Sequence, residues 1–316
     1  MRFALMIEPQ QDISWELNVA IAQRSEAAGI GTLYRSDHYE SFPGAPGRRS
    51  TDAWASIAGL VRETSDLRHG TMVSPVTFRH PANIAKVVAT VDEMSGGRVE
   101  LGLGAGWHVD EHRRHGLAFP DRQARLEMME EQFQVVSGLW SGEAGWSFRG
   151  KHYVVEDALY APRPVQRPRP PLIMGTKGAP RGLRAAALWA DHLNLYDIGP
   201  DTAREVFARF DDVCATLGRD PATVTRSVLC GIAVGSDRGE AERRGEAAAA
   251  VFGYASVAEW QRENGQLWAI GTPDQAIVRV REFASAGAEL IILQDFLPED
   301  LDHIDLLGAL ASEWSD

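Results

Sequence analysis

A histidine and an aspartate stand together where a short apolar segment of the sequence ends. Asp37 and His38 follow the segment 31–34, which has the composition of a β-strand. Histidine titrates near neutral pH, so His38 at a strand end could donate or accept a proton. A neighbouring carboxylate could orient it, although adjacent residues of a strand point to opposite faces. We predict His38 and Asp37 as catalytic residues, and a capped turn at the surface is the plainer alternative.

Two glycine-rich segments also follow apolar runs. In the first, Gly102–His108, the glycines would let backbone amides approach a ligand closely. A tight bend explains this segment equally well, because it lacks the spacing of a dinucleotide-binding loop. The second, Gly175–Pro180, combines glycines, a hydroxyl, Lys177 and the start of a helix, with Arg181 and Arg184 close behind. Together these groups predict a phosphate-binding turn, and an ordinary helix start is the alternative.

Histidines and carboxylates that could bind a metal occur between these two segments. The run contains His108, Asp110, Glu111, His112 and His115. His108 and His112 are four residues apart and could share a helical face. The H-E-x-x-H pattern is absent, however, and the interleaved arginines are typical of a solvated turn. We therefore predict no metal site.

Aromatic residues near the same segments could wall a flat, ring-shaped ligand, although each singly is typical of ordinary packing. They are Tyr39, Phe42, Phe78, Trp107, Trp146 and Phe148.

The composition is that of a globular protein and excludes several classes of function. The 316 residues include 44 acidic and 32 basic side chains, a net charge of −12. Nucleic acid is therefore not an expected partner, because its phosphates require clustered Lys and Arg. Two cysteines, Cys214 and Cys230, cannot form a disulfide framework. No segment reaches the roughly 18 apolar residues that span a bilayer, and no signal core follows Arg2. We expect a cytoplasmic protein with no membrane partner.

Short apolar segments alternate with amphipathic ones along the whole chain. Strands are expected at 3–7, 31–34, 70–73, 99–103, 172–174, 192–196, 228–234 and 290–293. Helices are expected at 15–28, 52–62, 81–94, 122–139, 180–189 and 201–217, with others around the last two strands. Eight such units predict a (β/α)8 TIM barrel as a single domain over 1–316, and an open doubly wound sheet is the alternative. A hairpin insertion at 146–160 and a longer excursion at 253–271, before the last unit, depart from the ideal pattern.

In this order, the motifs resemble those of the bacterial luciferase-like family of flavin- and deazaflavin-dependent oxidoreductases, nearly end to end. The segments that carry the resemblance are Ser36–His38, Val73–Pro75, Phe78–Pro81, Met94–Arg98, Gly102–His108 with Glu111, Gly150–Tyr153, Pro170–Gly178, Ala190–Asn194 and Gly271–Pro273. The branch that uses coenzyme F420 is the most similar. This follows from the SDH motif at 36–38 and the PPLIMGTKG stretch at 170–178 that leads to ADHLN at 190–194.

The resemblance implies a barrel, usually dimeric, that binds F420 or FMN at its C-terminal mouth. It implies that His38 is the acid–base residue beside the reacting ring carbon, with Asp37 next to it. It also implies a non-proline cis peptide between Met72 and Val73 that presses on the ring. The cofactor-binding residues that it implies are Thr71, Met72, Val73, Gly104, Gly106, Gly175, Thr176, Lys177 and Gly178.

Two positions depart from the F420-dependent sugar-phosphate dehydrogenases that the chain resembles. Those enzymes have a tryptophan where this chain has Phe42, and a glutamate where it has Trp107. We therefore predict a substrate pocket of Phe42, Trp107 and His108 that suits an apolar or aromatic molecule better than a sugar phosphate.

The predicted function is hydride transfer between F420 and a small, apolar or aromatic organic substrate, carried out by a homodimer. The first alternative is an FMNH2-dependent monooxygenase that uses O2, with a reductase supplying the reduced cofactor. The second alternative is a non-catalytic flavin-binding protein.

Overall fold

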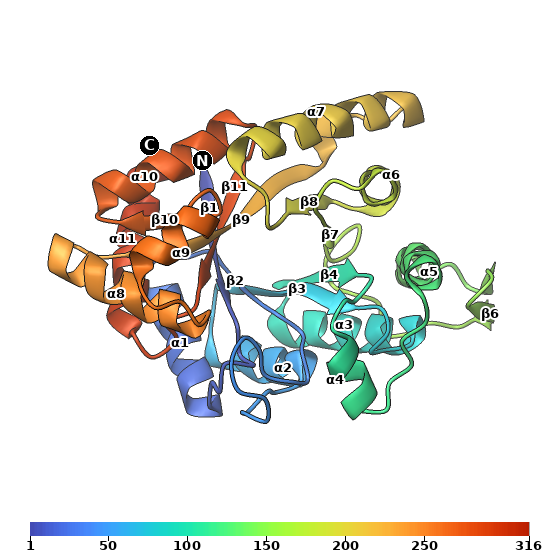
Figure 1. Cartoon of the computed structure of the whole chain (residues 1–316). Coiled ribbons are helices and arrows are strands. Elements are labelled where there is room, and N and C mark those ends of the chain that lie inside the picture. Colours follow the sequence, from blue (N-terminus) through green and yellow to red (C-terminus); the bar gives the residue numbers. More distant parts are fainter. Residues whose placement is uncertain (316) are drawn as a thin grey trace.

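The computed structural model describes residues 1–315 and shows a closed barrel of eight parallel strands surrounded by helices (Figure 1). The barrel strands are β1 (Arg2–Ile7), β2 (Thr32–Arg35), β3 (Arg68–Pro75), β4 (Val99–Gly104), β7 (Leu172–Thr176), β8 (His192–Leu195), β9 (Thr225–Val234) and β11 (Leu290–Asp295). The sheet order is β9, β11, β1, β2, β3, β4, β7 and β8, and β8 pairs back onto β9. This last pairing closes the sheet, which confirms the predicted TIM barrel and excludes the open doubly wound alternative.

The helices follow the predicted alternation with the strands. They are α1 (Trp15–Ala27), α2 (Ala53–Glu63), α3 (Pro81–Ser95), α4 (Val109–Arg114), α5 (Arg122–Ser141), α6 (Pro180–Trp189), α7 (Pro200–Leu217), α8 (Arg238–Val251), α9 (Val257–Asn264), α10 (Pro273–Ser285) and α11 (Leu301–Ser315). Their ends are set by local chemistry. The side chain of Asp52 caps the first turn of α2, and Gly96 ends α3 in the left-handed conformation at φ 68°.

Side chains alternate along the barrel strands and form two apolar layers. Ala4 and Met6 of β1 pack with Tyr34 of β2 and Ile292 of β11 in a cluster inside the barrel. Leu5, between Ala4 and Met6, packs instead with the helices in the outer cluster. Because the period is two residues, the inner set also identifies which residues at the strand ends face the barrel axis.

The two predicted departures from the ideal pattern are present. The hairpin consists of antiparallel strands β5 (Trp146–Arg149) and β6 (Val154–Ala158), which lie beside α5 (Figure 1). The excursion contains α9 and a further strand, β10 (Trp268–Gly271), neither of which the sequence predicts as an element. Strand β10 pairs with the last four residues of β9, from Gly231 to Val234, and so extends the barrel wall at its C-terminal end.

The two ends of the described chain meet on the outside of the barrel (Figure 1). The amino group of Met1 donates a hydrogen bond to the carbonyl oxygen of Ser315 at 3.3 Å. Among the helices of residues 1–315, none has both the length and the apolar character needed to cross a membrane.

Candidate active site

His38 lies just beyond the C-terminal end of β2, and a buried carboxylate fixes its ring. Its Nδ1 is 3.0 Å from Oε2 of Glu111 and 3.3 Å from Oε1. The side chain of Glu111 is 1% exposed and that of His38 is 12% exposed. Because Nδ1 is engaged with the carboxylate, Nε2 is the ring nitrogen left to face a ligand at the barrel mouth.

The environment of Glu111 favours its ionised form. Glu111 lies in the first turn of α4, and its carboxylate accepts hydrogen bonds from the backbone amides of Tyr39 and Glu40 as well as from His38. Burial opposes ionisation, but these hydrogen bonds and the neighbouring imidazole outweigh it and lower the pKa of Glu111. A carboxylate that stays charged can hold the His38 ring in one orientation.

Three further rings surround His38. The ring of Phe42 meets it edge-on with centroids 4.4 Å apart, and that of Trp107 lies 5.8 Å away. Phe42 and Trp107 are themselves 5.1 Å apart at an interplanar angle of 85°, and His108 lies 4.9 Å from Phe42. Trp107 is 61% exposed. The structure thus gathers the three residues of the predicted substrate pocket around the predicted acid–base histidine.

Asp37 faces away from this cluster, which corrects the prediction that it acts beside His38. Its carboxylate accepts a hydrogen bond from Ser74 at 2.6 Å and pairs with Arg79 at 2.5 Å. Arg79 also pairs with Asp52, the cap of α2. Asp37 has no exposed surface and cannot touch a ligand unless its neighbours move. Adjacent residues point to opposite faces, and this alternation places His38 inside the barrel and Asp37 outside it.

Thr71 belongs to the same outer network as Asp37. Its side chain is buried, its hydroxyl donates to the carbonyl oxygen of Gly102 at 3.3 Å, and it lies 3.2 Å from the hydroxyl of Ser74. The prediction that Thr71 lines a cofactor ring is therefore not matched by its side chain. It helps instead to hold β3 against β4.

Val73 stands on a surface of glycines at the ends of β4 and β7. A Cβ atom added to Gly104 would lie 2.5 Å from the Val73 side chain, and one added to Gly102 would lie 2.9 Å from it. At Gly175 the same distance would be 3.2 Å. The peptide bond between Met72 and Val73 is cis, as the resemblance implies. Glycines on the neighbouring strands therefore leave room for the Val73 side chain, which packs directly against their backbone.

Gly106 continues this glycine surface beyond the end of β4. Its φ is +75°, and an added Cβ would lie 3.1 Å from the Thr77 hydroxyl. A side chain at this position would therefore be strained and crowded.

The predicted phosphate turn has the expected backbone at the start of α6. The cap position of α6 is Ala179, which has no side-chain hydrogen bond to give, so the first amides of the helix are not capped by a side chain. Gly178 has a φ of +93°, and its amide donates to the hydroxyl of Thr176 at 3.1 Å. Such a helix N-terminus favours an anion.

The predicted basic spot at this turn is largely neutralised, which is a correction. Lys177 pairs with Asp197 on the surface, and Arg181 makes a two-pronged ion pair with Glu130 at 2.6 and 2.8 Å. The sequence could not show this, because both acidic partners lie on distant segments. The backbone of the turn, more than its cations, is what a phosphate would meet first.

The run of possible metal ligands forms helix α4, where a solvated turn is predicted. His108 caps this helix by accepting a hydrogen bond from the amide of Glu111 at 3.1 Å. His112 is buried and its Nε2 lies 2.6 Å from the hydroxyl of Thr77. Burial lowers the pKa of His112. Over residues 1–315 no group of three or more metal-binding side chains is assembled.

A buried polar chain at the mouth is absent from the sequence predictions. Glu8 accepts hydrogen bonds from the side-chain amides of Gln10 and Gln294, and Ser36 donates to the amide oxygen of Gln10. The available signal is the period of two residues, because Glu8 follows the inward-facing Ala4 and Met6. Glu8 follows β1, the strand next to β2, and Ser36 lies two residues before His38.

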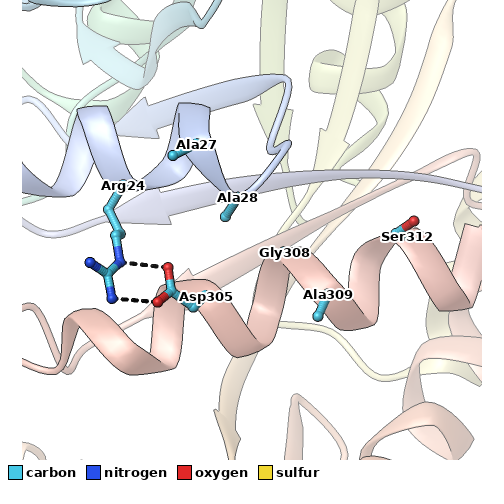
Figure 2. A pocket seen from close by; sticks show the side chains of 7 residues that line it. All are labelled: Arg24, Ala27, Ala28, Asp305, Gly308, Ala309 and Ser312. Carbon is cyan, nitrogen blue, oxygen red and sulfur yellow. Dashed lines mark hydrogen bonds and ion pairs between the residues drawn. The ribbon is translucent and has the colours of Figure 1, made fainter.

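A hollow of about 600 Å³ lies elsewhere, on the outside of the barrel between α1 and α11 (Figure 2). It is an open groove spanned by the ion pair of Arg24 with Asp305. Its floor is made of small residues, and Gly308 approaches the carbonyl oxygen of Ala28 so closely that a Cβ would lie 2.3 Å from it. The end of α1 that lines it leads into the N-terminal end of β2, the opposite end from His38. This groove is therefore separate from the candidate site.

Comparison with known proteins agrees with the fold. The model of the luciferase-like monooxygenase family matches residues 1–290. An F420-dependent hydroxymycolic acid dehydrogenase of Mycobacterium tuberculosis is 28% identical over 282 residues, 85% of this chain and 76% of that protein. An FMNH(2)-dependent dimethylsulfone monooxygenase of Pseudomonas putida is 24% identical over 314 residues, 90% of this chain and 84% of that protein. The crystal structure of monooxygenase RslO1 from Streptomyces bottropensis superposes with a TM-score of 0.83 at 20% identity and covers 99% of this chain and 98% of that one.

A closed (β/α)8 barrel with a carboxylate-held histidine and an aromatic cluster at its C-terminal mouth defines an enzyme of the barrel class. The chain belongs to the luciferase-like monooxygenase family. Relatives in this family use either F420 or reduced FMN, and they include both dehydrogenases and monooxygenases.

Proposed function

We propose that this enzyme transfers hydride between coenzyme F420 and a small organic substrate that packs against Phe42 and Trp107. The observation that carries the proposal is the position of His38. Its ring is fixed by Glu111 at 3.0 Å, lies among three aromatic side chains and faces the barrel mouth. A histidine held in this way can give or take the proton that accompanies transfer of a hydride to or from a substrate oxygen or nitrogen.

The residues around Val73 fit the cofactor that the proposal requires. Gly102, Gly104 and Gly175 would clash with or crowd Val73 if they carried a Cβ, so Val73 lies directly on their backbone, and its side chain would be the platform under a flat ring. The backbone at Gly175–Gly178 and the uncapped first turn of α6 would hold the phosphate. When bound, the deazaflavin supplies the two-electron hydride chemistry, and the chain's own residues orient the substrate and move the proton.

Two observations favour F420 over FMN. The motifs at 36–38, 170–178 and 190–194 resemble the F420-dependent branch. A relative that uses F420 is 28% identical over 85% of the chain. The FMNH2-dependent alternative is supported by the dimethylsulfone monooxygenase, which aligns over 90% of the chain.

The site also indicates what the substrate contacts. Phe42 and Trp107 present two nearly perpendicular rings, which suits an apolar or aromatic part of a molecule. Action as a homodimer in the cytoplasm, as a single domain, is part of the same proposal.

An anaerobic assay separates the two cofactor chemistries. Reduced F420 is mixed with the enzyme and a panel of ketones, imines and activated alkenes, and its reoxidation is followed by absorbance. The proposal expects substrate-dependent reoxidation without O2. O2 uptake that depends on FMNH2 and a substrate, with no reoxidation of F420 by any compound, would favour the monooxygenase instead.

A further inference from the structure

A carboxylate that forms no ion pair within residues 1–315 is buried in the wall of the barrel mouth, and the one cation of these residues whose charge acts on it is the buried Arg35 of the neighbouring strand β2, which lies beyond ion-pair distance. Glu8 is 5% exposed, and its two oxygens accept hydrogen bonds from Gln10 at 2.6 Å and from Gln294. Both donors are neutral amides, and among residues 1–315 Glu8 forms no ion pair. Glu8 has no part in the proposed hydride transfer.

Glu8 faces the barrel axis on the same side as His38. Along β1 the inner layer contains Ala4 and Met6, and the next position of that face is Glu8. On β2 the inner layer contains Tyr34, and the same face continues through Ser36. The hydroxyl of Ser36 donates to Gln10 at 2.5 Å, so Glu8 is linked to the segment that carries His38.

Other buried carboxylates of the chain have partners that Glu8 lacks. Asp37 pairs with Arg79, and Glu100 pairs with Arg68. Asp92 contacts no cation but accepts hydrogen bonds from the side chain of Gln166 and from two backbone amides. Burying a charge is costly unless it is paired or fully hydrogen-bonded. Glu8 has two donors for two oxygens, each of which can accept a second hydrogen bond.

The loop that follows Glu8 touches the loop that carries Phe42. The side-chain amide of Gln11 donates to the carbonyl oxygen of Phe42, which joins the two loops. Aromatic faces such as those of Phe42 and Trp107 attract cations, and a carboxylate attracts them more strongly. Aromatic rings combined with an unpaired carboxylate are a suitable environment for an organic ammonium group.

We propose that the substrate of this site carries a protonated nitrogen, and that Glu8 is the residue that selects it. This inference rests on the proposed function, because it assigns the substrate class of the same pocket. Glu8 receives the ammonium group, and Phe42 and Trp107 hold the carbon skeleton next to it. In this proposal the 5% of Glu8 that stays exposed is the surface that the ammonium group contacts.

Binding of two probes of equal size tests this assignment. Benzylammonium and benzyl alcohol share one skeleton and differ in charge. Their affinities are measured by calorimetry on the full chain loaded with F420, or with FMN if only FMN binds. The expected result is a preference for benzylammonium of about tenfold or more. Equal affinity of the two probes for the unmodified enzyme would overturn the proposal without any variant.

Variants then locate the preference. Glu8→Gln removes the charge and should reduce the preference to less than about threefold. Glu289→Gln removes one charge at the N-terminal end of β11, beside Arg2, and should leave the preference unchanged. If Glu8→Gln does not fold, Glu8→Asp withdraws the charge by one methylene and must weaken the preference. A preference that persists undiminished in the folded Glu8 variant would overturn the assignment.

The two proposals can fail separately. A Glu8-dependent preference in a protein that binds FMN alone would contradict F420 as the cofactor and leave the substrate class standing. Reoxidation of F420 by a neutral substrate, with equal binding of the two probes, would support F420 as the cofactor and overturn the proposed substrate class.

Discussion

Oε2 of Glu111 lies 3.0 Å from Nδ1 of His38, and this pair joins helix α4 to the end of strand β2. Glu111 also accepts hydrogen bonds from two amides of the loop that follows His38, so a single carboxylate fixes both the ring and its backbone. The ring of His38 is thereby held beside those of Phe42 and Trp107. We regard this pair as the centre of the site.

Replacing His38 removes the proposed acid–base group. We expect His38→Ala to lower kcat by at least about 100-fold, the usual contribution of a positioned acid or base. Binding of F420 should stay within a small factor of the original value, since the proposed cofactor contacts are backbone and glycine. Steady-state turnover and a cofactor titration measure the two quantities. Unchanged turnover with normal cofactor binding would exclude the role assigned to His38.

Replacing Glu111 tests a positioning role. Glu111→Gln should lower kcat by about 10-fold with little change in KM. A carboxylate that orients a functional histidine without touching the substrate typically contributes a factor of about that size. Glu111→Asp keeps the charge and should recover part of the lost kcat, because it can still orient the ring. Glu26→Gln is the matched control. Glu26 also accepts hydrogen bonds from backbone amides, at Ser65, Asp66 and Leu67, but lies far from the mouth. A kcat that is unchanged in the folded Glu111→Gln enzyme, or equally low in Glu111→Gln and Glu111→Asp, would argue for a purely structural carboxylate.

Asp37 should matter for stability more than for chemistry. Asp37→Asn leaves Arg79 with one carboxylate instead of two and should lower the free energy of unfolding by about 3 kcal/mol. Urea denaturation followed by circular dichroism measures the change. If the folded variant lost activity with no loss of stability, Asp37 would be acting on the ligand directly.

The glycine surface under Val73 can be tested by a pair of substitutions. Gly104→Ala puts a Cβ 2.5 Å from the Val73 side chain and should cost about 1–3 kcal/mol by overpacking. Val73→Ala removes the clashing methyl groups, so the double variant should recover most of that loss. Gly31→Ala, which has open space around its Cβ, is the control. If the losses of stability in the two single variants simply add in the double variant, the two residues do not contact each other.

Two buried histidines predict sensitivity to acid. Burial lowers the pKa of His69 from 6.5 to about 3 and that of His192 from 6.5 to about 4. Below pH 6.5 the unfolded chain therefore binds protons that the folded chain does not, and stability falls by about 1.4 kcal/mol per pH unit for each histidine. For each histidine the loss of stability continues until the pH reaches the pKa of that histidine in the folded chain.

Unfolding measured between pH 6 and pH 5 checks this linkage. His69→Gln or His192→Gln should reduce the slope of unfolding free energy against pH by about 1.4 kcal/mol per pH unit, which corresponds to one proton. His115→Gln, at an exposed position, should leave the slope unchanged. An identical slope in all three variants would contradict the assignment.

The sequence predicts the barrel well because its signals are local. The apolar segments and caps such as Asp52 lie within single elements, and the structure places all eight strands where they are expected. Strand β10 is missed because the short segment Trp268–Gly271 gains its pairing only from the extended end of β9.

The site is predicted less completely, because its partners come from distant segments. His38, Phe42 and Trp107 are predicted and found together. The pairing of His38 with Glu111, of Arg79 with Asp37 and of Glu8 with Gln294 depends on side chains 73, 42 and 286 residues apart. The alternation of β2 already places His38 and Asp37 on opposite faces. Applied strictly, this rule predicts that only one of the two residues faces the ligand.

A titration of the purified protein with the two cofactors tests the central claim most directly. F420 and FMN are added separately in the oxidised form, and dissociation constants are taken from the change in cofactor fluorescence or from calorimetry. The proposal predicts that F420 binds at least about 10-fold more tightly than FMN and that Gly104→Ala weakens its binding, since overpacking beside Val73 disturbs the surface it would occupy. Tight binding of FMN with no measurable binding of F420 would contradict the account.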